Sequence, residues 1–160
     1  MTPPELIAEL RRRGVGLAVA ESLTGGALSS ALVEVPGASA VFRGGVVSYA
    51  TELKHRLLGV DSDLLAAEGP VHPIVAVQMA RGAASRLAAE GQPTLGLATT
   101  GVAGPDPQGD AVVGTVFVAA VLGNEELVRE HRFAGDRADV RSAAVVAVLA
   151  LAREALAPTA

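Results

Sequence analysis

VGLAVAESLTGGALSSALV, residues 15–33, decides the fold class of this chain. Residues 15–20 are a short apolar run, which predicts a buried strand. Residues 21–26 are small and polar, which predicts a tight loop. Residues 27–33 then have helical character. A strand that passes through a glycine-containing loop into a helix is the repeating unit of α/β folds.

The same alternation of strand and helix patterns continues along the chain. Further helices are expected after Pro3-Pro4 to about residue 13, after a cap at Thr51 through residue 58, from about 61, and over 73–89 and 137–156. Further strands are expected over 41–50, 95–99, 115–122 and 127–133. Gly123-Asn124 between the last two strands is typical of a hairpin turn. We therefore predict a three-layer α/β/α sandwich around a mixed, mostly parallel sheet with one antiparallel hairpin. Residues 1–160 contain no linker and are expected to form a single domain.

Composition argues against several classes of protein. A net charge of −4 is unfavourable for binding nucleic acid. The chain has no cysteine, which excludes disulfides, thiolate catalysis and cysteine-ligated metals. His55, His72 and His131 lack the spacing of metal ligands, so we expect no metal and no cofactor. The first residues do not resemble a signal peptide, and the longest apolar run, 143–152, is too short to cross a bilayer. We therefore expect a cytoplasmic protein with no membrane partner.

Lys54 is the single lysine among thirteen basic residues. An ammonium group that is desolvated can lose its proton and act as a base, whereas a guanidinium stays protonated. If Thr51 caps a helix, Lys54 lies in the first helical turn, where the helix dipole helps to lower its pKa. The alternative is a lysine that lies along the surface.

The loop at residues 21–26 is the first candidate binding loop. Its small residues leave backbone N–H groups free to hold an anion or a transient oxyanion, and the Ser22 hydroxyl is expected to face that pocket. The alternative is that Ser22 or Thr24 caps the next helix, while Gly25 and Gly26 serve the turn.

A second candidate is the long glycine-rich loop that begins at Thr99-Thr100-Gly101 and ends at Gly114. A loop this long and rich in glycine is uncommon unless it binds something, and the alternative, a flexible connector, would not explain Thr99-Thr100 at the end of the strand. It lacks the lysine of a Walker A motif, so nucleoside triphosphate hydrolysis is not expected. Farther along, Arg137 and Arg141 could place a guanidinium near a phosphate. The alternative is that this segment only begins the last helix, with Asp136 as its N-cap.

Together these segments resemble the C-terminal domain of the competence/damage-inducible protein CinA, a family that includes the nicotinamide-nucleotide amidohydrolases of the PncC type. The resemblance runs from about Glu5 to Leu156. Residues 20–26 resemble the family's A-E-S-C-T-G-G segment, and residues 49–54 its tyrosine-x4-lysine segment. Residues 100–105 with 113–116 are similar to T-G-I-A-G-P and V-G-T-V, and residues 135–141 to G-D-R-x-x-V-R.

The resemblance implies hydrolysis of the carboxamide of nicotinamide mononucleotide to nicotinic acid mononucleotide and ammonia, without a metal. It implies that Ser22 is the nucleophile, with Lys54 and Tyr49 as activating partners. Lys54 takes the serine proton either directly or through Tyr49. The expected substrate-binding residues are Thr24, Gly25, Gly26, Thr99, Thr100, Gly101, Gly104, Arg137 and Arg141.

Two departures from the family pattern stand out. Leu23 replaces a frequent cysteine, and the segment Asp110–Val113 lacks the lysine of K-P-V-G-T-V, which weakens the case for phosphate binding there. The alternative function is a non-catalytic nucleotide-binding or regulatory domain of the same fold. The expected partner is a pyridine nucleotide, and a homo-oligomer, in the form of a symmetric dimer, is the default expectation.

Overall fold

The computed structural model describes residues 1–157, which form helices and strands in alternation. The strands are β1 (Gly16–Glu21), β2 (Phe42–Val47), β3 (Thr94–Gly101), β4 (Thr115–Leu122) and β5 (Glu125–Arg132). The α-helices are α1 (Pro3–Arg13), α2 (Ala27–Val33), α3 (Thr51–Leu58), α4 (Ser62–Glu68), α5 (Pro73–Leu87) and α6 (Arg137–Ala155), and a short 3-10 helix covers Ala38–Ala40. The predicted order of elements is confirmed.

The strands form one mixed sheet in the order β2-β1-β3-β4-β5. β1 pairs in parallel with β2 and β3, whereas β4 is antiparallel to both β3 and β5. Four strands therefore run in one direction and β4 runs in the other, which confirms the mixed, mostly parallel sheet and the hairpin at Gly123-Asn124. The antiparallel pairing of β3 with β4 across the long loop at residues 102–114 was not part of the prediction.

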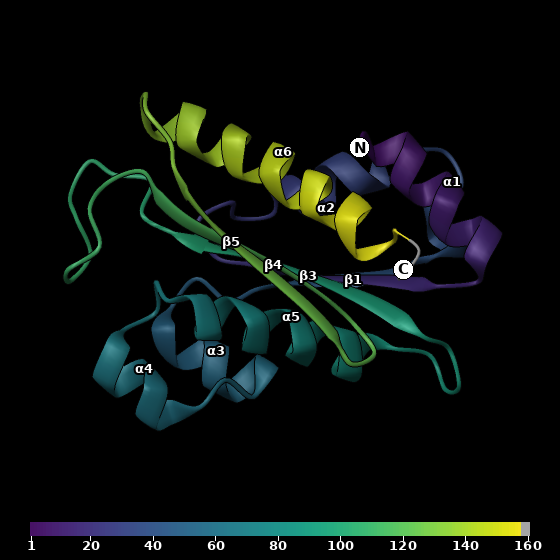
Figure 1. The fold of residues 1–160 in the computed structure, drawn as a ribbon, viewed down its shortest axis with the longest axis horizontal. Coiled ribbons are helices and arrows are strands. Elements are labelled where there is room, and N and C mark those ends of the chain that lie inside the picture. The colour runs from purple at the N-terminus through teal and green to yellow at the C-terminus, as the bar shows by residue number, and fades with distance from the viewer. Residues whose placement is uncertain (158–160) are drawn as a thin grey trace.

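Helices cover both faces of the sheet, as the three-layer prediction requires (Figure 1). α1, α2 and α6 lie on one face, and α3, α4 and α5 lie on the other. Each face has its own apolar cluster: Leu17 and Val19 of β1 point into the first, and Ala18 and Ala20 into the second. This alternation follows from the two-residue period of a strand that is buried on both sides.

Close backbone contact fixes α3 and α5 against each other. A Cβ atom at Gly82 of α5 would collide with the carbonyl oxygen of Leu58, the last residue of α3. A glycine at this position therefore lets the end of α3 lie directly on α5. Since α3 carries Lys54, this contact also helps to determine where that side chain lies.

The helix ends confirm one prediction and correct another. Asp136 is the N-cap of α6, and its side chain accepts hydrogen bonds from the N–H groups of Ala138 and Asp139. The expectation that Thr51 caps α3 is wrong: Ala50 is the N-cap, no side chain caps this end, and Thr51 is the first helical residue. Lys54 still lies in the first turn of α3. None of the helices in residues 1–157 combines the length and the apolar character needed to cross a membrane.

Candidate active site

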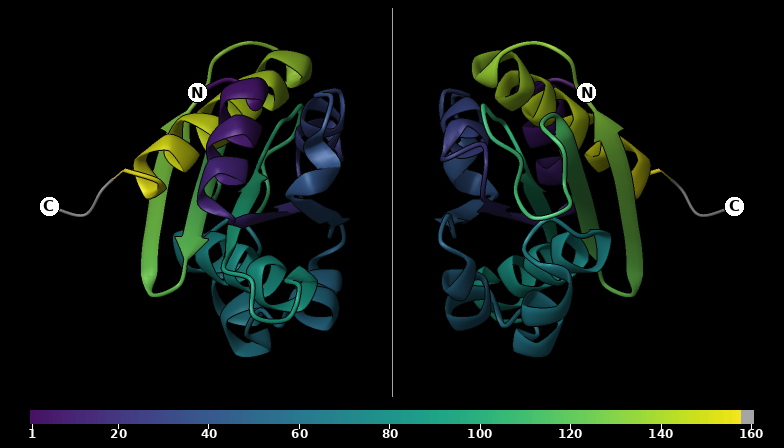
Figure 2. Two further views of the ribbon diagram at one scale, coloured as in Figure 1. Left: turned by 90° about the vertical axis from the view of Figure 1, so that its right-hand side faces the viewer. Right: turned by 90° about the vertical axis from the view of Figure 1, so that its left-hand side faces the viewer.

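A pocket of about 310 Å³ lies beside the carboxyl ends of β1 and β3. In open α/β sheets, ligands bind in the crevice outside the carboxyl ends of the strands. The long loop between β3 and β4 forms one wall and faces the viewer in the right-hand view of Figure 2. Ser22, Tyr49, Lys54, Thr100, Gly104 and Arg137 are among the residues that line the pocket.

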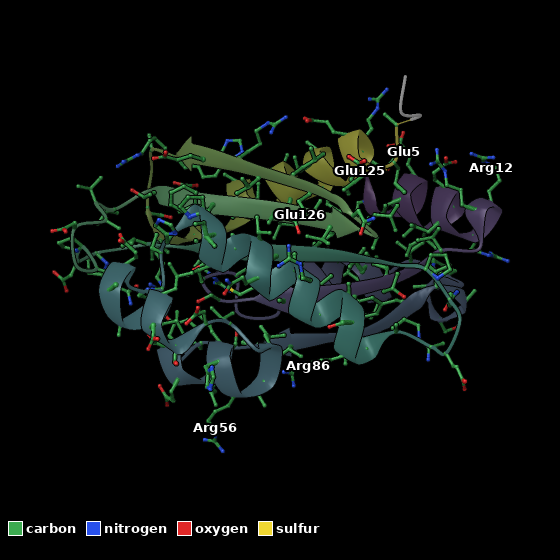
Figure 3. All side chains as sticks on the ribbon, turned by 60° about the horizontal axis from the view of Figure 1, so that its bottom comes forward. Glu5, Arg12, Arg56, Arg86, Glu125 and Glu126 are labelled. Carbon is green, nitrogen blue, oxygen red and sulfur yellow. The ribbon has the colours of Figure 1, made fainter. Side chains whose placement is uncertain are left out.

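Ser22 and Lys54 are in direct contact inside this pocket. The Nζ atom of Lys54 lies 3.0 Å from Oγ of Ser22 and donates a second hydrogen bond, 2.8 Å long, to the carbonyl oxygen of Ser48. Lys54 is 1% exposed and Ser22 is 8% exposed. By contrast, Arg56 on the same helix projects away from the body of the protein (Figure 3). The lysine thus lies within the protein and not along its surface.

Burial changes the acid–base chemistry of Lys54. Desolvation lowers its pKa from the ordinary value of 10.5 to about 8, against a smaller opposing effect from the carboxylate of Glu52. No ion pair within residues 1–157 involves Lys54. With this pKa, about a tenth of the amine is neutral at pH 7. A neutral amine can accept the proton of a neighbouring hydroxyl, which is what a general base must do.

Backbone and hydroxyl contacts hold the start of the Ser22 loop on the sheet. The N–H of Ser22 donates to the carbonyl oxygen of Thr99, 3.0 Å away. The hydroxyl oxygens of Thr24 and Thr99 lie 2.8 Å apart, and both side chains are buried. These two threonines therefore join the loop to β3 beneath the pocket.

Glu21 is a residue of the site that the sequence analysis did not single out. Its buried carboxylate accepts hydrogen bonds from the N–H groups of Gly26, Leu28 and Ser29 and from the Ser29 hydroxyl. The alternative that Ser22 or Thr24 caps α2 is therefore wrong, since the Ser22 hydroxyl contacts Lys54, the Thr24 hydroxyl contacts Thr99, and Glu21 binds this helix end. An acidic residue shortly before a helix was the available signal.

The remaining N–H groups near Ser22 are candidate donors to an oxyanion. Within residues 1–157, the backbone N–H groups of Leu23, Ala103 and Gly104 make no hydrogen bond, and all three residues line the pocket. The N–H groups of Gly26, Leu28 and Ser29 are already bonded to Glu21 and that of Ala27 to the carbonyl oxygen of Thr24, so they do not serve this purpose. An unpaired N–H beside a nucleophile can stabilise negative charge that develops on a carbonyl oxygen.

Tyr49 lies at the rim of the pocket and away from the Ser22–Lys54 contact. Its side chain is 59% exposed, and its hydroxyl oxygen accepts a 2.8 Å hydrogen bond from Nη2 of Arg137. Nη1 of the same guanidinium donates to the carbonyl oxygen of Gly104, at 2.7 Å. Tyr49 forms no hydrogen bond with Ser22 or Lys54 in the described part of the chain. The contact between Ser22 and Lys54 is therefore direct, and the Tyr49 hydroxyl takes no part in it.

The other expected binding residues divide into two groups. Thr100, Gly101, Gly104 and Arg137 line the pocket, and the Thr100 hydroxyl donates to the carbonyl oxygen of Pro70 at 2.7 Å. The second group lies outside the lining: Thr24, Gly25, Gly26, Thr99 and Arg141.

Arg141 contacts the Ser22 loop and not the pocket. Its Nε donates to the carbonyl oxygen of Leu23 at 3.0 Å and its Nη2 to that of Thr24 at 2.8 Å. These bonds hold the loop from the side of α6. The guanidinium of Arg141 is thus tied to the backbone of the loop that follows Ser22.

Two histidines bond to the backbone. Nδ1 of His55 lies 2.8 Å from the carbonyl oxygen of Val60, and Nδ1 of His72 accepts from the N–H of Ile74 at the start of α5. Among residues 1–157 there is no group of three histidine or carboxylate side chains arranged to hold a metal ion.

Comparison with known proteins identifies the family of the chain. Residues 3–156 match the model of the CinA C-terminal domain. This chain belongs to the CinA C-terminal domain family. The Glu21-to-Gly26 loop, the Tyr49-to-Lys54 segment and the glycine-rich loop all lie within the part of the chain that matches the CinA C-terminal domain.

Individual relatives agree with this assignment. A CinA-like protein of Frankia casuarinae is 54% identical over 148 residues, and one of Geobacter sulfurreducens is 44% identical over 140 residues. These alignments cover 92% and 87% of this chain but 33% of each relative. The chain therefore spans about a third of the length of these curated relatives.

Solved structures of the same superfamily have the same fold. The competence/damage inducible protein CihA of Agrobacterium tumefaciens superimposes with a TM-score of 0.88 at 34% identity, covering 95% of this chain and 92% of that one. The CinA superfamily protein ECK1530/EC0983 of Escherichia coli gives a TM-score of 0.89 at 31% identity, covering 97% and 91%.

Proposed function

We propose that this CinA-family domain is a nicotinamide-nucleotide amidohydrolase, which converts nicotinamide mononucleotide and water into nicotinic acid mononucleotide and ammonia. The observation that carries the proposal is the 3.0 Å contact between Nζ of Lys54 and Oγ of Ser22 in a buried pocket. A serine that attacks an amide needs an adjacent base, and a lysine with a lowered pKa can replace histidine in that role.

The proposed reaction begins with neutral Lys54. Its amine takes the proton of the Ser22 hydroxyl while Oγ bonds to the carboxamide carbon, and a tetrahedral oxyanion forms. When this intermediate collapses, the C–N bond breaks and the Lys54 ammonium returns a proton to the departing nitrogen, which leaves as ammonia. A water molecule, deprotonated by the same amine, then attacks the resulting ester. When the second intermediate collapses, the bond from the carbonyl carbon to Oγ breaks, the Lys54 ammonium returns its proton to Oγ, and the carboxylic acid is released.

The pocket offers groups for the charges of this substrate. The unpaired N–H groups of Leu23, Ala103 and Gly104 are the proposed donors to the oxyanion. Arg137 at the rim is the proposed cation for the phosphate group, because the segment 110–113 lacks the family's lysine. We propose that Tyr49, bonded to Arg137, orients this guanidinium and contacts the nucleotide.

Measurement of ammonia release tests the proposal. The chain is incubated with nicotinamide mononucleotide, nicotinamide riboside, free nicotinamide and an aliphatic carboxamide. We expect the highest kcat/KM with the mononucleotide. Ser22→Ala and Lys54→Ala are each expected to lower turnover by about three orders of magnitude or more. Near-parental turnover by either folded variant would contradict the assignment.

Calorimetric titration separates this activity from the alternative function. If the mononucleotide binds saturably and no ammonia is released at any of the pH values tested between about 6 and 10, the result would favour a non-catalytic nucleotide-binding or regulatory domain. A Ser22→Ala variant that still binds the nucleotide but releases no ammonia is the result that the amidohydrolase predicts.

A further inference from the structure

Glu21 is the last residue of β1 and directly precedes Ser22. Its side chain is 0% exposed, and no basic residue within residues 1–157 forms an ion pair with it. We propose that Glu21 is a positioning residue, which holds the loop that carries Ser22 in the geometry needed for attack. This inference rests on the proposed function, since it assigns Glu21 a part in the same reaction.

Four donors surround the carboxylate of Glu21. Its Oε2 accepts from the N–H groups of Gly26 and Leu28, both at 3.0 Å. Its Oε1 accepts from the N–H of Ser29 at 2.8 Å and from the hydroxyl of Ser29 at 2.6 Å. Both carboxylate oxygens are therefore occupied by donors from the N-cap and the first turn of α2, which offsets the desolvation of the charge.

These bonds join the two ends of residues 22–26, which carry Ser22 and are called the nucleophile loop below. Residues 22–26 connect β1 to α2, and the side chain of Glu21 binds the far end of that connection. Ser22 therefore lies between a strand end and a helix end that are held together by the residue before it. A shift of the α2 N-terminus would move the loop and change the position of Oγ relative to Lys54.

Groups of opposite charge hold opposite sides of the loop. Glu21 binds backbone N–H groups, whereas Arg141 binds the carbonyl oxygens of Leu23 and Thr24. The N–H of Leu23 is left unpaired beside the pocket. The two contacts together set the orientation of the peptide that follows the nucleophile, which is the peptide whose N–H faces a developing oxyanion.

Space for this arrangement comes from the neighbouring strand. A Cβ atom at Gly45 of β2 would collide with the hydroxyl oxygen of Ser29. The missing side chain lets Ser29 reach Oε1 of Glu21 across the end of the sheet. The carboxylate, the serine and the glycine therefore form one packed unit beneath the nucleophile loop.

The arrangement specifically requires a carboxylate. A glutamine has one oxygen that accepts and one nitrogen that donates, so Glu21→Gln would set an N–H donor against other donors. The Ser29 hydroxyl can rotate to accept from that nitrogen, but the backbone N–H of Ser29 cannot. At least one N–H of the first turn of α2 therefore loses its partner in the variant.

Steady-state kinetics test the role of Glu21. We expect Glu21→Gln to lower kcat for ammonia release from nicotinamide mononucleotide by about tenfold to a hundredfold, as small displacements of reacting groups do. KM should stay within about twofold, and the acid limb of the pH profile should not shift, because Glu21 contacts neither the pocket nor Lys54. A parental kcat, or a raised KM as the main effect, would overturn the inference.

Two serine variants provide a matched comparison if Glu21→Gln folds poorly. Ser29→Ala removes one of the four donors and keeps the carboxylate, and we expect kcat to fall several-fold at constant KM. Ser30→Ala alters the exposed neighbour on α2, whose side chain does not bind Glu21, and should match the parent. Equal kinetics for the two serine variants would count against the positioning role.

Amide hydrogen exchange provides a readout that needs no substrate. The N–H groups of Gly26, Leu28 and Ser29 should exchange faster in Glu21→Gln than in the parent, while those of α5 stay unchanged. Unchanged exchange at all three would show that Glu21 does not hold the loop. If the parent releases no ammonia from any carboxamide, the proposed function fails, and the exchange data still decide whether Glu21 fixes this segment.

Discussion

Lys54 combines complete burial with a position next to a hydroxyl group. A buried amine without a carboxylate partner is unusual because its charged form loses hydration that no counterion replaces. The two acceptors around Nζ, Oγ of Ser22 and the carbonyl oxygen of Ser48, provide only part of that lost hydration. The residue thus lowers stability in its charged form, and this is the same property that makes it a usable base.

The pH dependence of activity should report the titration of this amine. Because burial lowers the pKa of Lys54 to about 8, the neutral base becomes more abundant as the pH rises through this value. We expect kcat/KM for ammonia release to rise about tenfold per pH unit below pH 8 and to level off above it. A profile that is flat between pH 6 and 9, measured with the intact parent, would contradict the role of Lys54 as the base.

Stability should also depend on this titration. The unfolded chain holds the Lys54 proton up to about pH 10.5 and the folded chain only up to about pH 8, so the unfolded state binds more protons between these values. The free energy of unfolding of the parent should therefore rise through that window, relative to Lys54→Met, by about 3 kcal/mol. Below pH 8 the full penalty of the buried charge is present, and above pH 10.5 it is gone.

Urea unfolding at several pH values between 7 and about 10.5 measures this difference. Most other groups titrate alike in the parent and in Lys54→Met, so their effects cancel in the comparison. A difference between the two proteins that stays constant with pH would show that the folded-state pKa of Lys54 is not lowered.

The contact between α3 and α5 links the helix that carries Lys54 to the core. In Gly82→Ala, the new methyl group collides with the carbonyl oxygen of Leu58, and α3 must move away from α5. We expect a loss of about 1–3 kcal/mol in the free energy of unfolding, as for other overpacked sites. The shift should also lower kcat, because Nζ of Lys54 moves relative to Ser22.

Thermal or urea unfolding together with kinetics on Gly82→Ala checks this coupling. Alanine favours a helix over glycine by up to about 1 kcal/mol, so an increase in stability would mean that the helices separate without strain. That result, or a parental kcat in a destabilised protein, would contradict a link between this packing contact and the position of Lys54.

Several elements were predictable because their signals are local. Thr2 and Asp136 cap α1 and α6, and glycines follow α1 and α3, so these helix ends lie close to where the sequence placed them. The direction of pairing between β3 and β4 was not predictable in this way. An apolar run identifies a strand but carries no information about which neighbour it pairs with or in which direction.

Net charge is a property of the whole molecule that limits its partners. With thirteen basic and seventeen acidic side chains, the chain lacks the excess positive charge that binding to phosphate backbones requires. We expect no retardation of duplex DNA by the chain in a mobility-shift assay at about 150 mM salt. Retardation that survives this salt concentration would point to a nucleic-acid partner in place of a small molecule.

The order of apolar and small residues in this chain was sufficient for the fold class. Its single lysine and its serine after a strand made Lys54 and Ser22 candidates, and the motifs shared with the CinA family assigned both to one site. Those signals are chemical or local, so they can be recognised without coordinates. The contacts around the pocket depended on folding: Lys54 meets Ser22 across 32 positions, Arg137 meets Tyr49 across 88, and Arg141 meets Leu23 across 118. Glu21 is adjacent to Ser22 in the chain, yet its role appears only once α2 folds back onto its carboxylate. Contacts of this kind arise from the packing of distant elements, whose distances and hydrogen bonds a linear pattern does not encode.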